Sequence, residues 1–164
     1  MFRWVAARLF IGLVNIQYQF YNTLPPELLL TSLLDLLTGV FVNQSLSEFQ
    51  AELTRQRDQT GLHVLLATTE GQVVGCKLGY ERKPGHFYSW LGAVRADRRG
   101  QGIAGELMRQ QHDWCRQHGY HTIRTQTYNQ WRQMLILNLR FGFDIVGTVQ
   151  GKHGLTIVME KNSM

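Results

Sequence analysis

The chain has 164 residues, a mass of 19.0 kDa and a formal net charge of +5, from 17 lysines and arginines against 12 aspartates and glutamates. Its 44% hydrophobic residues are enough for one folded domain and exclude a disordered chain. The basic residues form no run of five or more, so we expect no nucleic-acid partner and a surface that attracts small anions.

The two cysteines and the N-terminus bear on the cellular setting. Cys76 and Cys115 lie in no spacing typical of a zinc or redox site, so we expect no metal and a reduced, cytoplasmic protein. The apolar run near the N-terminus is interrupted by Arg8 and is shorter than the about 20 residues that cross a bilayer, so we expect no membrane binding. We interpret residues 1–13 as a leader segment and residues 14–164 as a single domain.

The domain is predicted to begin with a strand at residues 16–21, where polar and apolar side chains alternate, and a helix opened by Pro25 and Pro26. Ser45 to Glu48 has the pattern of a capping box and begins a second helix. Closely spaced strands then favour an antiparallel meander, followed by alternating helices and strands and a final hairpin. The ranges expected after the first strand are, in order, 25–39, 45–57, 63–68, 72–81, 86–94, 102–118, 120–127, 129–142, 143–149 and 155–160.

This order of elements predicts an α/β fold with a mixed sheet, an antiparallel front half and helices on both faces. Asn129 is placed to cap the last helix, whose apolar stripe through Trp131 and Leu135 is interrupted by Asn138. A buried amide needs hydrogen-bond partners, so Asn138 is either a core residue bonded to a neighbouring strand or a contact for a ligand.

The loop between the strand ending at Val94 and the next helix is rich in glycine, with the sequence VRADRRGQGIAG over residues 94–105. Gly100 and Gly102 allow backbone N–H groups to point into one concavity, and the helix start adds partial positive charge. The loop is therefore predicted to be an anion cradle for a phosphate or pyrophosphate. It is not a Walker A loop, because no Lys-Ser or Lys-Thr pair follows the glycines.

Gly100, Gly102 and Gly105 also satisfy the dinucleotide pattern G-x-G-x-x-G. The acidic residue that would hold the ribose about 20 positions later is missing, although Arg124 would suit the 2′-phosphate of NADP. The loop follows an antiparallel meander and does not open the fold, which disfavours this alternative. An NADP-binding domain stays open as a remote alternative.

Two separated motifs indicate a known family. The first is Arg99-x-x-Gly102-x-Ala104, and the second is Thr125-x-Thr127-x-Asn129 followed by Met134-Leu135-x-x-Asn138-x-x-x-Gly142-Phe143. Together they resemble the GNAT superfamily of acyl-CoA N-acyltransferases. The strand Phe87–Gly92 together with Met134-Leu135-x-x-Asn138 resembles a bacterial subgroup of unassigned substrate. The resemblance implies direct transfer of an acetyl group from acetyl-CoA to an amine of a small molecule or peptide.

The resemblance also implies roles for residues. Ala93 and Val94 would bind the pantetheine arm of CoA, and Asn129 and Asn138 would line the other wall of the cleft. Many members carry a tyrosine at the position of Asn138 as proton donor to the leaving thiolate, and asparagine is unable to act as such an acid. A CoA-binding protein without turnover therefore stays open. The backbone amides implied to bind the pyrophosphate are those of Arg99, Gly100, Gln101, Gly102, Ile103 and Ala104.

Glu81 and Tyr88 are the candidate catalytic residues, with Glu81 as a base if neighbouring aromatic residues raise its pKa. An exposed carboxylate at the end of a strand is the alternative for Glu81. Trp90 shares a face with Tyr88 and is predicted to wall the acceptor pocket, and Thr125 and Thr127 are assigned to the same pocket; sheet packing is the alternative for each. His86 is a weaker candidate for a catalytic residue. Asp97 is expected to hydrogen-bond within its own loop. A homodimer stays open.

Overall fold

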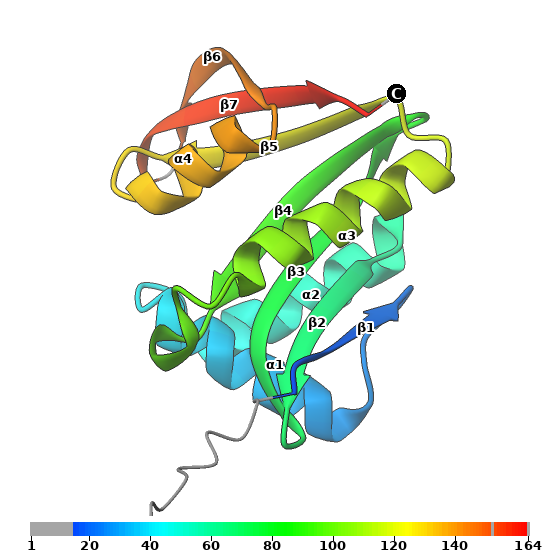
Figure 1. Cartoon of the computed structure of the whole chain (residues 1–164), viewed down its shortest axis with the longest axis vertical. Helices are drawn as coiled ribbons and strands as arrows, with labels where there is room; N and C mark the ends of the chain where they lie inside the picture. The colour runs from blue at the N-terminus through cyan, green and yellow to red at the C-terminus, as the bar shows by residue number, and fades with distance from the viewer. Residues whose placement is uncertain (1–14, 152, 164) are drawn as a thin grey trace, which may run out of the picture.

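The computed structural model describes residues 15–151 and 153–163 (Figure 1). In this part of the chain seven strands form one sheet, in the order β1-β2-β3-β4-β5-β7-β6, and β4 and β5 are the parallel pair. The predicted leader segment, residues 1–13, lies outside the described residues. The strands are β1 (Gln17–Tyr21), β2 (His63–Thr69), β3 (Gln72–Lys83), β4 (His86–Val94), β5 (Thr122–Tyr128), β6 (Asp144–Gly151) and β7 (Gly154–Asn162).

Helices cover both faces of the sheet, which confirms the predicted fold class. On one face α1 (Glu27–Val40) and α2 (Leu46–Thr60) pack on β2, β3 and β4 through a core that includes Leu33, Phe49 and Leu78. On the other face lie α3 (Ile103–Gln117) and α4 (Arg132–Arg140), and a short 3₁₀ turn, η1 (Ala96–Arg98), precedes α3. Figure 1 shows α3 in front of the sheet and α1 and α2 behind it.

The ends of the predicted elements agree with the structure within three residues. The capping box is confirmed, because the amide N–H of Glu48 donates to Ser45 Oγ and the amide N–H of Ser45 donates to the Glu48 carboxylate. The predicted cap at Asn129 is wrong. The amide N–H of Trp131 donates to the carbonyl of Tyr128, which adds a turn, so α4 starts beyond the reach of Asn129 and has no side-chain cap.

Gly75 in β3 sets how closely α3 approaches the sheet. A Cβ atom at this position would lie 2.8 Å from Ile103 Cγ2 and 3.1 Å from Leu107 Cδ1. These distances are shorter than van der Waals contact, so only glycine permits the first turn of α3 to sit on β3. The start of α3, where the cradle was predicted, is thereby fixed against the centre of the sheet.

His63 at the start of β2 is buried in a cluster of aromatic rings. Its ring centroid lies 4.0 Å from that of Trp114, 5.3 Å from Phe20 and 5.8 Å from Phe87, and both ring nitrogens lack a hydrogen-bond partner. Burial lowers the pKa of His63 to about 4, with a further contribution from His118, because a charged imidazolium would lose its hydration there. The folded protein therefore holds this ring neutral.

Acidification is expected to destabilise the protein through His63. Below pH 6.5 the unfolded chain takes up a proton that the folded chain binds only near pH 4, so the free energy of unfolding falls as the pH falls through this window. The loss due to this one group is roughly 2–3 kcal/mol at pH 4.5. Denaturant unfolding at pH 7 and pH 4.5 measures it, and His63→Phe should remove that part of the difference. An equal loss in the variant would contradict the assignment to His63.

Candidate active site

The loop between β4 and α3 has the geometry of an anion-binding cradle. Gly100 and Gly102 have φ angles of +73° and +80°, in the left-handed region that glycine adopts readily, and Gly102 is the N-cap of α3. Among the described residues, no backbone N–H from Arg99 to Gly105 donates to another residue, and the first that does is Glu106, to the carbonyl of Gly102 at 3.0 Å. These free amides and the helix dipole together favour a bound anion.

Side chains of the same loop hold its shape and add positive charge. The guanidinium of Arg95 donates two hydrogen bonds to the Asp97 carboxylate, at 2.7 and 3.1 Å, which lower the pKa of Asp97. Asp97 therefore acts within its own loop, as expected from the sequence. Arg99 Nε donates to the carbonyl of Val94 at 3.2 Å, which ties the cradle to the end of β4.

Strand β4 has a free edge next to the cradle. It pairs with β5 only from His86–Ser89 to Thr122–Thr125, and Figure 1 shows the two strands separating beyond this point. The register with β3 shifts between Ser89 and Leu91, so Trp90 is an extra residue in β4. From Leu91 to Val94 the strand pairs with β3 alone among the described residues, which leaves backbone groups on its other edge for an extended ligand.

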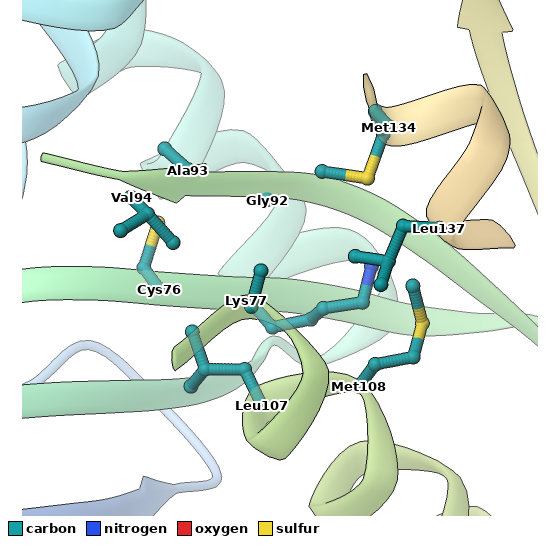
Figure 2. A pocket seen from close by; sticks show the side chains of 10 residues that line it. Cys76, Lys77, Gly92, Ala93, Val94, Leu107, Met108, Met134 and Leu137 are labelled. Carbon is teal, nitrogen blue, oxygen red and sulfur yellow. The ribbon is translucent and has the colours of Figure 1, made fainter. Parts of the chain in front are cut away.

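An apolar cleft, narrow in this structure with a volume of about 10 Å³, lies between α3 and α4 over this part of β4 (Figure 2). It begins at Val94 and Ala104, beside the cradle, and extends to Met134 and Leu137 of α4. Its one charged lining residue is Lys77 of β3, which the sequence analysis missed. The other lining residues are Cys76, Gly92, Ala93, Leu107 and Met108.

The opposite face of the sheet carries an aromatic group at the same level. The ring of Tyr80 lies 5.4 Å from Tyr88 and 6.0 Å from Trp90, so the predicted pairing of Tyr88 and Trp90 on one face is confirmed. Burial raises the pKa of Tyr88 to about 12, with Tyr80 adding to the shift. The neighbouring Arg124 of β5 donates to Glu160 Oε1 at 2.9 Å.

Thr125 and Thr127 are buried on the other face, where α3 and α4 pack. Thr125 Oγ1 donates to the carbonyl of Ser89 at 2.9 Å, at the point where β4 and β5 begin to separate. The structure therefore does not bring the two threonines together with Trp90.

The remaining predicted residues are dispersed. Asn138 is 1% exposed, its Nδ2 donates to Met159 Sδ at 3.8 Å, its Oδ1 has no partner, and it is not among the residues that line the cleft. Asn129 is exposed in the turn before α4. Glu81 is exposed at the end of β3 remote from the cradle, and its Oε2 accepts a hydrogen bond from the Tyr120 hydroxyl at 3.0 Å. Their predicted roles stay predictions.

A sequence model described as the acetyltransferase (GNAT) family matches residues 30–143. The chain belongs to this family. Comparison with curated protein sequences found no match.

Solved structures of GNAT acetyltransferases share the fold. An N-acetyltransferase from Staphylococcus aureus Mu50 has a TM-score of 0.72 and 19% identity over 92% of this chain and 99% of that one. An aminoglycoside 6′-acetyltransferase type Ii has a TM-score of 0.75 and 18% identity over 90% and 97%. A ribosomal-protein-alanine N-acetyltransferase from Brucella melitensis has a TM-score of 0.68 and 21% identity over 88% and 99%. The names of these proteins give different acceptors. The shared fold therefore leaves the acceptor of this GNAT protein open.

The residues present fit the CoA that this GNAT fold implies. The unpartnered amides of the cradle suit a pyrophosphate, the free edge of β4 suits the amides of an extended arm, and the apolar cleft suits its aliphatic carbons. In residues 15–151 and 153–163, no cluster of three metal-ligating side chains occurs and no helix is long and apolar enough to span a membrane.

Proposed function

We propose that this protein transfers an acetyl group from acetyl-CoA directly to an amine of a small molecule or peptide, in the cytoplasm. The observation that carries the proposal is the continuity of three features. A set of free amides at the start of α3 meets the unpaired edge of β4, and both border one apolar cleft.

In this proposal each part of the cleft has one task. The amides of Arg99 to Ala104 hold the pyrophosphate, and Ala93 and Val94 hold the pantetheine arm along the edge of β4. Acetyl-CoA supplies an activated acyl group. Because a thioester reacts directly with a neutral amine, the protein has to position the two and remove water, and no covalent enzyme intermediate is needed.

We assign the acceptor to the face that carries Tyr88 and Trp90. Beyond Ser89 no β4–β5 ladder separates the two faces of the sheet, so an amine on the aromatic side can approach an acyl group held at the edge of β4. With its pKa raised to about 12, Tyr88 keeps its proton at neutral pH and serves as a hydrogen-bond donor to the acceptor, not as a base. An exposed Glu81 carboxylate is the candidate base, acting through water.

Release of CoA thiol from acetyl-CoA in the presence of a panel of amines tests the proposal. The panel should include aminoglycosides, polyamines and peptides with free N-termini, each compared with a reaction that lacks the amine. We expect acceptor-dependent thiol release and a product heavier by one acetyl group. Tight binding of CoA with no turnover on any amine would instead indicate a CoA-binding protein.

A further inference from the structure

Lys77 is a buried cation without a counter-ion. It lies in the middle of β3 between the buried residues Cys76 and Leu78, and the residue is 6% exposed. Among the described residues, no carboxylate forms an ion pair with its Nζ and no acceptor forms a hydrogen bond with it. Burying a lysine in an apolar site without a partner costs several kcal/mol of desolvation. Packing contacts alone do not offset this cost.

The backbone of β4 directs this ammonium into the cleft. Lys77 is paired in register with Gly92, and a Cβ atom at Gly92 would lie 3.6 Å from Lys77 Nζ. Lys77 Nζ therefore lies within van der Waals reach of β4 at Gly92. Figure 2 shows the Lys77 side chain extending from β3 into the cleft, which Leu137 also lines.

Among the described residues, no carboxylate acts on Lys77 Nζ, and the acidic groups near it are the thiols of Cys76 and Cys115. On the α3 side, Lys77 Nζ faces Cys115 and His112. The pKa of His112 is lowered to about 3 by burial and by the neighbouring lysines. Lys161 of β7 adds a second positive charge nearby, with its Nζ 3.2 Å from His112 Nδ1. Helix α4 contributes only Met134 and Leu137 to the lining of the cleft. The part of the cleft around Lys77 therefore has a positive potential inside an apolar wall, which favours a bound anion or a group that becomes one.

The cleft itself indicates what that group is. It adjoins the cradle at Ala104 and reaches Met134 and Leu137 of α4, and Lys77 Nζ and Met134 Cε would both lie 3.6 Å from a Cβ atom at Gly92. An acyl-CoA with its pyrophosphate on the cradle and its arm along the free edge of β4 would have its sulphur in the part of the cleft that Lys77 lines. The sulphur is the atom that gains negative charge when the acyl group leaves.

We propose that Lys77 is the proton donor to the sulphur atom of CoA when the acyl group is transferred, an inference that rests on the proposed function. The carbon–sulphur bond breaks, its electron pair stays on sulphur, and one proton moves from Lys77 Nζ to give CoA thiol. Lys77 becomes a neutral amine, and the proton that the acceptor nitrogen loses on forming the amide returns to it through water. This assignment gives the chain an acid that Asn138 is unable to supply.

The acidity of Lys77 suits this role. Burial lowers its pKa to about 8, opposed in part by Cys76 and Cys115, and this value is close to the ordinary value of a thiol. Proton transfer between groups of matched pKa is efficient at neutral pH. At pH 7 the ammonium form predominates, and it is lost as the pH rises through about 8, so kcat should fall above that pH.

The test compares wild type with Lys77→Met, whose unbranched side chain is one atom shorter, carries no charge and suits the apolar wall. We expect CoA affinity to change by less than about 5-fold, kcat to fall about 100-fold and the fall of kcat above pH 8 to disappear. The pKa of enzyme-bound CoA thiol, followed by the ultraviolet absorbance of the thiolate, should be at least about one unit higher in the variant, because the ammonium no longer stabilises the anion.

Bound CoA with the same thiol pKa in both proteins would overturn the role of Lys77 while leaving the proposed function intact. Failure of both proteins to bind CoA would overturn the proposed function as well. Stable acetylation of Lys77, detected by mass spectrometry after incubation with acetyl-CoA, would also contradict the proposal, because the amine would then be an acceptor and not a proton donor.

Discussion

Gly102→Glu is expected to weaken the binding of acetyl-CoA and of free CoA at least about 100-fold. The residue has a φ of +80° at the N-cap of α3, so a glutamate is strained there. Its carboxylate would also stand among the free amides of Arg99 to Ala104, where a pyrophosphate should bind, and juxtaposed like charges cost several kcal/mol. Isothermal titration of the purified variant measures the loss.

A matched control separates the loss of the cradle from backbone strain. Gly61 has a φ of +71° after the end of α2, and like Gly102 it has no atom within 4 Å of an added Cβ. Gly61→Glu introduces the same side chain at a positive φ away from the cradle, and with a ψ of 141° against 2° at Gly102 its backbone strain is at least as large, so its CoA affinity should match wild type. Equal affinity of Gly102→Glu and wild type would show that the anion binds elsewhere.

Gly79→Ala is expected to lower the free energy of unfolding by about 2–3 kcal/mol. A Cβ atom at Gly79 would lie 2.4 Å from two ring atoms of Phe87 and 2.6 Å from the carbonyl oxygen of Tyr88. The phenyl ring is buried and the carbonyl belongs to the backbone of β4, so neither can move away at low cost. Urea unfolding of the two proteins measures the difference.

Gly147→Ala in β6 is the control for this change, because no atom lies within 4 Å of its added Cβ. We expect its free energy of unfolding to stay within about 0.5 kcal/mol of wild type. An equal loss in free energy of unfolding in both alanine variants would contradict this prediction. The loss would then come from replacing any strand glycine and not from the contact with Phe87.

Features encoded by adjacent residues could be predicted from the sequence. The capping box at Ser45 needs only four consecutive residues, and the cradle is one loop whose glycines, arginines and helix start follow each other in the chain. The alternation of Tyr88 and Trp90 likewise survives in the structure, since both rings contact Tyr80. In these cases local geometry decides the outcome.

Features that depend on strand register could not be predicted. Lys77 enters the cleft because β3 pairs it with Gly92, fifteen positions along the chain, and because the extra residue Trp90 shifts the register of β4. Register also decides the position of Thr125, which the sequence assigned to the acceptor pocket. In the structure it pairs with β4, and its hydroxyl donates to the carbonyl of Ser89. The one signal of Lys77 in the sequence is a charged residue within the otherwise apolar stretch Val73–Gly79 of β3, which indicates a buried cation but not what it faces.

The most direct test of the central claim follows backbone amide resonances of ¹⁵N-labelled protein during titration with acetyl-CoA, and separately with NADP. We expect acetyl-CoA to produce the largest shifts at Arg99 to Ala104 and at Ala93 and Val94, and NADP at the same concentrations to leave the Ala93 and Val94 signals unchanged. Shifts with NADP alone, or acetyl-CoA shifts confined to residues outside the cradle and β4, would contradict it.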